Sequence, residues 1–148
     1  MKIAGAAPDE ALRERALAPD ASFLVQAPAG AGKTELLIQR YLRLLSLVDE
    51  PEEILAITFT RKAAAEMQRR ICQALVGEPR AGSADSVSGR RQQLLVAAVR
   101  SRDRARGWGL ADYPSRLRIS TIDSLNASLA RSTPVSSGTN VLRPLATQ

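Results

Sequence analysis

A lysine and a threonine follow two closely spaced glycines near residue 30, in a stretch that reads APAGAGKT. Glycines allow backbone N–H groups to curl around phosphate oxygens at the start of a helix. In such a loop a lysine reaches the β- and γ-phosphates of a nucleotide, and the next hydroxyl binds Mg²⁺. We therefore predict a nucleotide site with Lys33 and Thr34 as catalytic residues, Thr34 as the Mg²⁺ ligand, and this cofactor-binding set: Ala27, Pro28, Ala29, Gly30, Ala31, Gly32, Lys33, Thr34 and Glu35.

A phosphate loop of this kind needs a strand before it and a helix after it. Residues 22–26 (SFLVQ) are a short apolar run typical of a buried strand. After the loop, apolar residues recur at helical spacing until Pro51 ends the pattern. Ala27 stands where the general pattern has glycine, so a chance glycine-rich turn is the alternative interpretation. The flanking elements favour the phosphate site.

Further strands and helices alternate along the chain. Thr60 is a candidate N-cap for the helix that follows the second strand. Besides residues 22–26, the predicted strands are 54–59 (ILAITF) and 117–121 (LRIST), and the predicted helices are 8–18, the stretch after the phosphate loop, 61–76, 90–106 and 122–131. This alternation predicts an α/β fold with a parallel sheet covered by helices on both faces.

Ligands of such sheets bind at the carboxyl ends of the strands. The loops at 27–34, 58–62 and 120–124 all follow predicted strands. We therefore expect these three loops to share one rim of the sheet.

The three loops also carry a resemblance to a known family. VQAPAGAGKT is similar to motif I of the UvrD/Rep-like superfamily 1 DNA helicases, ILAITFTRKAAAEM to motif Ia, and ISTIDSLNASLAR to the later DNA-contacting motif often called Ib or Ic. Among these helicases the chain looks most like the helicase–nuclease subunits of the AddA and RecB type (exonuclease V beta). The resemblance covers most of residues 22–131 apart from 77–116.

The resemblance implies that residues 1–131 are the N-terminal part of a RecA-like ATP-binding domain, with an inserted segment at about 77–116. It implies an ATP-dependent DNA helicase or translocase in DNA repair or recombination, with ATP and Mg²⁺ as cofactors. Single-stranded or partly duplex DNA is the implied partner, together with a second helicase–nuclease subunit. The implied DNA-binding residues are Thr58, Phe59, Thr60, Arg61, Lys62, Thr121, Asp123 and Ser124.

Three of these positions also have purely structural interpretations, and one of them is Thr60, which either contacts DNA or only caps its helix. Phe59 either stacks on a base or ends its strand in the core, because it closes an apolar run. Ser120 and Asp123 match the S-x-x-D capping box, which predicts an N-cap at Ser120.

The chain departs from the family at several points. Arg13 stands near the position of a glutamine that reads adenine in many relatives, Arg61 replaces an asparagine, and Asp123 replaces a histidine. The sequence shows no carboxylate pair that would complete the metal site and orient the water. It also shows no arginine finger from a second domain. Asp49-Glu50 follows Lys33 too closely for that pair and continues the helical period. We therefore expect this chain alone to be inactive as an ATP hydrolase.

Composition excludes several classes of chemistry. The chain has no histidine and one cysteine, Cys72, which excludes histidine catalysis, histidine-ligated metals and intrachain disulfides. No apolar run approaches the ~20 residues that cross a bilayer. We expect a soluble, cytoplasmic protein.

The net charge of +6 is unevenly distributed, because residues 90–106 hold six arginines and one aspartate. This helix either contacts DNA or presents a solvated face. Trp108, between two glycines, is expected to anchor its loop to the core. Residues 77–89 are expected to form a mobile loop, and residues 132–148 a poorly ordered tail.

Two other functions remain open from the sequence alone. A small-substrate P-loop kinase fits the length, but TFTRKAAAEM has no role in that chemistry. A non-catalytic interaction module that keeps a nucleotide loop is the third interpretation.

Overall fold

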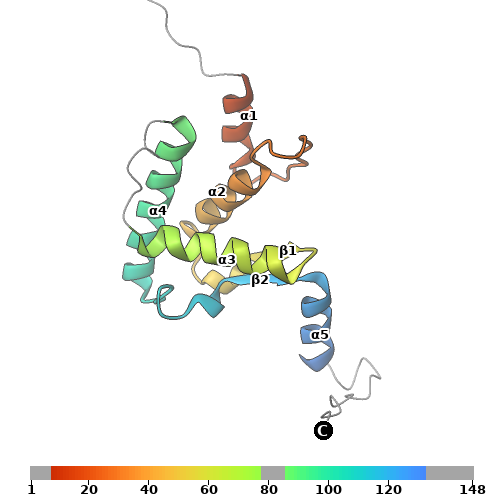
Figure 1. The fold of residues 1–148 in the computed structure, drawn as a ribbon. Helices are drawn as coiled ribbons and strands as arrows, with labels where there is room; N and C mark the ends of the chain where they lie inside the picture. The colour runs from red at the N-terminus through yellow and green to blue at the C-terminus, as the bar shows by residue number, and fades with distance from the viewer. Residues whose placement is uncertain (1–7, 78–85, 133–148) are drawn as a thin grey trace, which may run out of the picture.

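The structure, a computed structural model, describes residues 8–77 and 86–132 (Figure 1). The elements in chain order are α1 (Pro8–Ala16), α2 (Lys33–Leu45), the 3₁₀ turn η1 (Pro51–Glu53), β1 (Leu55–Thr58), α3 (Arg61–Val76), α4 (Val87–Arg106), the 3₁₀ turn η3 (Pro114–Arg116), β2 (Arg118–Thr121) and α5 (Ile122–Ser132). The segment predicted as a mobile loop lies mostly outside the described residues, and so does nearly all of the predicted tail. None of the described helices is both long and apolar enough to cross a membrane.

The strands β1 and β2 form a parallel pair, in the register Ala56 opposite Ile119 and Thr58 opposite Thr121. Two of the three predicted strands are thereby confirmed. Ala56 belongs to the main core, whereas Leu55 and Ile57 on the other face are 40% and 46% exposed. Within the described ranges, helices cover one face of this pair. The prediction of helices on both faces is therefore wrong for this part of the chain.

The strand predicted at 22–26 is absent: residues 22–28 have no regular secondary structure and pair with neither β1 nor β2. Leu24 is 89% exposed and Phe23 39%. A strand exists only when another strand accepts its backbone hydrogen bonds. The prediction of a buried strand from this apolar run is therefore wrong for the described residues.

The main core lies between α2, α3, α4 and the buried side of β1 (Figure 1). Its largest fully buried side chains include Leu42 and Leu45 of α2 and Ile71 of α3. The amphipathic pattern in the sequence located the packed face of α2 only in part. Tyr41 and Leu45 are buried as the pattern predicts. Leu37, predicted on the apolar face, is 45% exposed, whereas Gln39, predicted on the polar face, is 2% exposed.

Trp108 is 2% exposed and its indole N–H donates to the Asp49 carbonyl oxygen at 3.1 Å. The predicted role of Trp108 as a loop anchor is confirmed.

The arginines of α4 mostly bind the chain itself. Arg100 donates to the Leu75 and Ala74 carbonyl oxygens at the end of α3, at 2.7 and 3.2 Å. Arg102 donates to the Val48 carbonyl oxygen at 2.9 Å and to the Asp49 carboxylate at 3.0 Å. Neither prediction for this helix, a DNA contact or a solvated face, anticipated these contacts, which join α4 to the ends of α2 and α3.

Candidate nucleotide and DNA site

The phosphate loop turns sharply into α2 through two glycines. Gly30 and Gly32 have φ angles of 79° and 77°, in the left-handed region that side chains with a Cβ rarely adopt. The Ala31 N–H closes a tight turn onto the Pro28 carbonyl oxygen at 3.3 Å, and α2 begins directly at Lys33. The helix predicted after the loop is confirmed.

The start of α2 presents unpaired backbone donors. Among the described residues, the N–H groups of Gly32, Lys33 and Thr34 donate to no acceptor. The positive end of the helix dipole lies at the same point. Consecutive free N–H groups at a helix N-terminus are the arrangement that binds phosphate, so the loop fits the predicted nucleotide.

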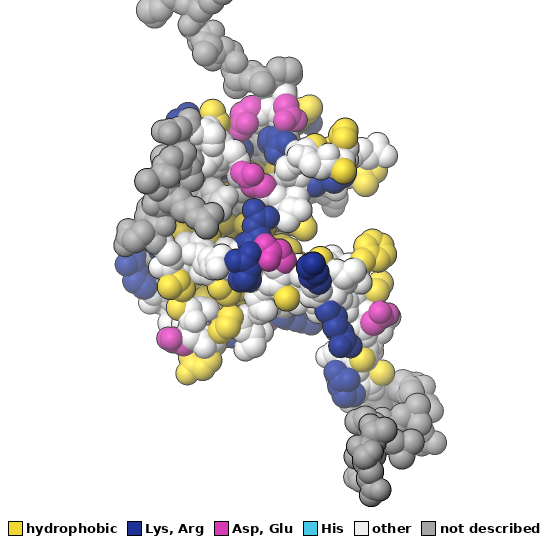
Figure 2. Space-filling view, viewed as in Figure 1, with side chains coloured by type: hydrophobic (Ala, Val, Ile, Leu, Met, Phe, Trp, Pro, Cys, Tyr) yellow, Lys and Arg dark blue, Asp and Glu magenta, His cyan; other side chains and the backbone are white. Residues whose placement is uncertain are grey.

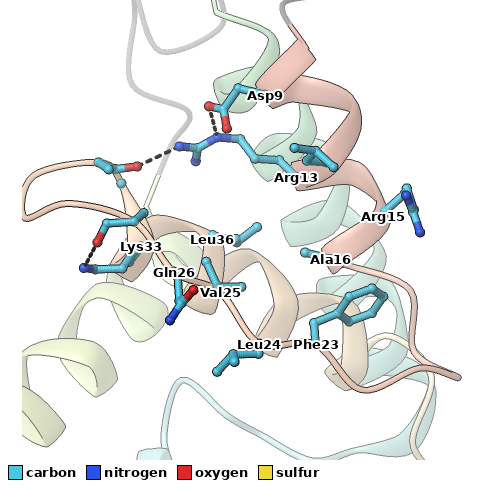
Figure 3. Close-up of a pocket in the computed structure, with 14 residues that line it drawn as sticks. Asp9, Arg13, Arg15, Ala16, Phe23, Leu24, Val25, Gln26, Lys33 and Leu36 are labelled. Carbon is cyan, nitrogen blue, oxygen red and sulfur yellow. Dashed lines mark hydrogen bonds and ion pairs between the residues drawn. The ribbon is translucent and has the colours of Figure 1, made fainter.

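The side chains of Lys33, Thr34 and Glu35 differ in their exposure and in what they contact. Lys33 is exposed, and its Nζ donates to the Ala27 carbonyl oxygen (Figure 3). Thr34 is exposed at the first turn of α2. Glu35 turns away, because its carboxylate accepts hydrogen bonds from Gln39 at 3.3 Å and from the Ser88 hydroxyl. Lys33 and Thr34 are thus accessible to a ligand, while Glu35 joins α2 to α4.

A pocket of about 320 Å³ lies beside the loop, between α1 and residues 23–27 (Figure 3). Arg13 of α1 extends over the loop and donates from Nη2 to the Ala31 carbonyl oxygen at 2.7 Å. Its Nε donates to the Asp9 carboxylate at 2.8 Å, and this hydrogen bond raises the pKa of Arg13 above its ordinary value. Three cations, Arg13, Arg15 and Lys33, therefore line the pocket.

The segment after β1 places exposed groups at the carboxyl end of the sheet. Thr60 caps α3 by accepting from the Ala63 N–H at 3.1 Å, which confirms the predicted N-cap. Phe59 is 95% exposed, so its interpretation as a core residue is wrong. Arg61 and Lys62 are exposed in the first turn of α3. Figure 2 shows Lys and Arg side chains in a band over α3 and down toward α5.

The segment after β2 lies at the same end of the sheet, because Thr58 and Thr121 are register partners. Thr121 is 5% exposed, and its hydroxyl accepts from the Ser124 N–H at 3.2 Å. The cap of α5 is therefore Thr121, and the prediction of Ser120 is wrong by one residue. Asp123 and Ser124 are exposed beside it.

The structure brings two of the three predicted loops together. Loops 58–62 and 120–124 share the end of the β1–β2 pair. The phosphate loop follows the unpaired segment, and Figure 2 shows a recess between it and the beginning of α3. The rim shared by all three loops is therefore not formed within the described residues, since strand 22–26 does not join the sheet.

Sequence reasoning missed several residues around the phosphate loop. The i, i+4 spacing of Asp9 and Arg13 predicts their ion pair. Nothing local predicts that Arg13 also reaches Ala31, or that Ser88 reaches Glu35 across 53 residues. Asp49, which resembles part of a metal-binding pair in the sequence, forms ion pairs with Arg102 and Arg106.

Comparisons with known proteins place these features in a family. Residues 9–143 match the family described as "UvrD/REP helicase N-terminal domain". DNA helicase II of Escherichia coli is 38% identical over 109 residues, which cover 72% of this chain and 15% of that relative. An ATP-dependent helicase/nuclease subunit of Moorella thermoacetica is 43% identical over 79 residues, which cover 51% of this chain and 6% of that relative. No solved structure matches significantly. The chain belongs to the UvrD/REP helicase N-terminal domain family.

Proposed function

We propose that this chain is the ATP-binding N-terminal portion of an ATP-dependent DNA helicase or translocase of the AddA or exonuclease V beta type, acting in DNA repair or recombination. The observation that carries the proposal is the intact GAGKT loop, which opens α2 with free N–H groups in a chain of a helicase family. The chain spans only 15% of DNA helicase II, so the activity belongs to a longer protein.

The chain's own residues bind and orient the nucleotide. The N–H groups of Gly32, Lys33 and Thr34 would hold the phosphates of ATP. The Lys33 ammonium would leave the Ala27 carbonyl oxygen for the β- and γ-phosphates. Thr34 would offer its hydroxyl to Mg²⁺, which is coordinated mainly by phosphate oxygens and water in such sites. When bound, Mg²⁺ neutralises charge that develops during phosphoryl transfer.

The DNA partner would lie at the carboxyl end of β1 and β2. The start of α3 offers N–H groups and the positive charges of Arg61 and Lys62 to backbone phosphates. The exposed ring of Phe59 is available for stacking on a base of single-stranded DNA. The name of the Moorella thermoacetica relative describes one subunit of a helicase/nuclease, which supports the proposal that a second subunit is a further partner.

Isothermal titration with Mg·ADP and with single-stranded DNA tests both sites on the same chain. Lys33→Ala should remove most of the ADP binding and leave DNA binding unchanged. Lys62→Ala, the matched control that removes a lysine from the other segment, should weaken DNA binding and leave ADP binding unchanged. Equal ADP affinity in the wild type and in Lys33→Ala would show that the loop is not the nucleotide site.

A further inference from the structure

Among the described contacts, Arg13 is the one side chain from outside the phosphate loop that makes a polar contact with the loop's backbone. Its Nη2 donates to the Ala31 carbonyl oxygen at 2.7 Å, 18 residues away in the chain. No described backbone N–H donates to that oxygen. Ala31 lies between Gly30 and Gly32, the two residues with left-handed backbone. Arg13 therefore binds the loop at the point where it turns.

The guanidinium also packs closely against the second glycine. A Cβ at Gly32 would lie 3.3 Å from Nη1 and 3.4 Å from Nη2 of Arg13. At Gly30, in contrast, a Cβ would meet no described atom within 4 Å. Arg13 thus packs against the Gly32 side of the loop and not against Gly30. An ion pair formed by chance on the surface would not need this close packing.

Arg13 is held in this place by its own helix. Asp9 accepts from Nε at 2.8 Å, so the two ends of the planar guanidinium are occupied by Asp9 and Ala31. Figure 3 shows Arg13 reaching toward the loop, while Arg15 on the same helix points away from it. The contact therefore depends on the position of α1.

The position of α1 is itself fixed from two sides. Arg40 of α2 donates to the Ala18 and Ala21 carbonyl oxygens, at 3.1 and 2.9 Å, just after α1. Arg91 of α4, with a side chain 13% exposed, forms ion pairs with Glu10 and Glu14. A helix anchored to both α2 and α4 can hold a side chain against the loop that begins α2.

We propose that Arg13 is a positioning residue of the phosphate loop, which holds the turn between Gly30 and Gly32 so that the N–H groups at the start of α2 face the phosphates. The inference rests on the proposed nucleotide site and adds a residue to it. Arg13 acts through the Ala31 backbone, so it affects the binding of any polyphosphate equally, whatever base is attached. A preorganised cradle binds more tightly because less ordering is left for the ligand to induce.

The test compares Arg13→Gln, Arg13→Lys and the control Arg104→Gln, which removes the same charge from an exposed position of α4 that does not line the pocket. Titration calorimetry measures the affinity for Mg·ADP and for Mg·pyrophosphate, a probe without a base. Losing a hydrogen bond from a charged group costs enough to lower both affinities about tenfold in Arg13→Gln. Arg13→Lys should lose as much, because an ammonium cannot bridge Asp9 and Ala31 as a planar fork does. Arg104→Gln should bind like the wild type.

Each other result overturns the inference. Restored affinity in Arg13→Lys would mean that charge alone matters, and a loss for ADP but not for pyrophosphate would mean that Arg13 contacts the nucleoside. Unchanged affinity in Arg13→Gln would leave the nucleotide site standing without Arg13. A wild-type chain that binds neither probe would refute the proposed function itself. Hydrogen exchange across α3 reports folding, and it should be the same in all variants.

Discussion

At the scale of single residues, the glycines of the phosphate loop meet two separate demands. Both Gly30 and Gly32 have a positive φ, which costs other residues about 1–2 kcal/mol. Only Gly32 also lies against a side chain, the guanidinium of Arg13. Substitutions at the two glycines therefore distinguish the effect of backbone strain from the effect of steric crowding against Arg13.

We predict that Gly30→Ala and Gly32→Ala both weaken Mg·ADP binding, and that Gly32→Ala weakens it more. The first variant has only the strain of a left-handed alanine, whereas the second must also shift the Arg13 guanidinium, which donates to Ala31, by a few tenths of an ångström. Titration of the two variants against the wild type measures the difference. Adding Arg13→Ala to each variant should equalise them, and a larger defect in Gly30→Ala would contradict this explanation.

At the scale of elements, α3 and α4 are both rich in arginine but differ in what their arginines contact. On α4, Arg91, Arg100, Arg102 and Arg106 bind acidic side chains or carbonyl oxygens of other elements. On α3, Arg61 and Lys62 are exposed at the helix start, beside the exposed Phe59. Charge counts along the sequence make α4 the stronger DNA candidate, yet the contacts favour α3.

We predict that Arg61→Ala/Lys62→Ala reduces the salt dependence of single-stranded DNA binding. Each phosphate contact contributes roughly −0.7 to the slope of log K against log salt on single strands, so losing two contacts flattens the slope by about 1.4. Fluorescence anisotropy at several salt concentrations gives the slope. Arg15→Ala/Arg104→Ala, which removes two exposed charges elsewhere, should leave it unchanged. An unchanged slope in the first variant would place the DNA path elsewhere.

We predict that Arg102→Ala destabilises the fold by about 1.5–3 kcal/mol, the range for hydrogen bonds made by a charged group. Arg102 holds the turn after α2 through Val48 and Asp49. Its loss removes the described donor to the Val48 carbonyl oxygen, whereas Asp49 keeps its ion pair with Arg106. Urea unfolding followed by circular dichroism measures the free energy of unfolding. Arg104→Ala, two residues further along the same helix and exposed, should change stability by less than about 0.5 kcal/mol. Equal effects would mean that the Arg102 contacts contribute nothing.

At the scale of the whole molecule, the described residues combine a packed helical core with open apolar edges. The β1–β2 pair leaves Leu55 and Ile57 partly exposed, and Leu24 in the unpaired run at 22–26 is exposed. Sheets of three or more strands are the usual stable unit, and this one has two in the described ranges. Together with the 15% coverage of DNA helicase II, this is the arrangement expected of one part of a larger catalytic unit.

We predict that the purified 148-residue chain binds Mg·ATP but hydrolyses it at a background rate, with or without DNA. The described residues supply Lys33 and Thr34, whereas efficient transfer also needs groups that orient water and an arginine against the transition state, the latter worth about 10³–10⁵ in rate. A phosphate-release assay measures the rate. DNA-stimulated turnover on the order of 1 s⁻¹, within the range of working phosphoryl-transfer enzymes, would contradict the prediction.

The sequence by itself determined the features that depend on neighbouring residues. The phosphate loop, the start of α2, the bounds of α3 and its Thr60 cap were all predictable, because helix caps, glycine conformations and apolar periodicity act over a few residues. The resemblance of three motifs was sufficient to identify the family. The cap of α5 was misplaced by one residue, since Ser120 and Thr121 both carry a suitable hydroxyl and only the end of β2 decides between them.

Only the tertiary structure decided the features that depend on distant partners. Residues 22–26 have the composition of a strand, but a strand needs a neighbour, and in the described structure this segment pairs with neither β1 nor β2. The arginines of α4 became internal contacts because folding brings Asp49 and the end of α3 beside them. Arg13 reaches Ala31 because α1 is anchored to both α2 and α4. In each case residue type specified which interactions were possible, and the packing of remote elements selected the one that formed.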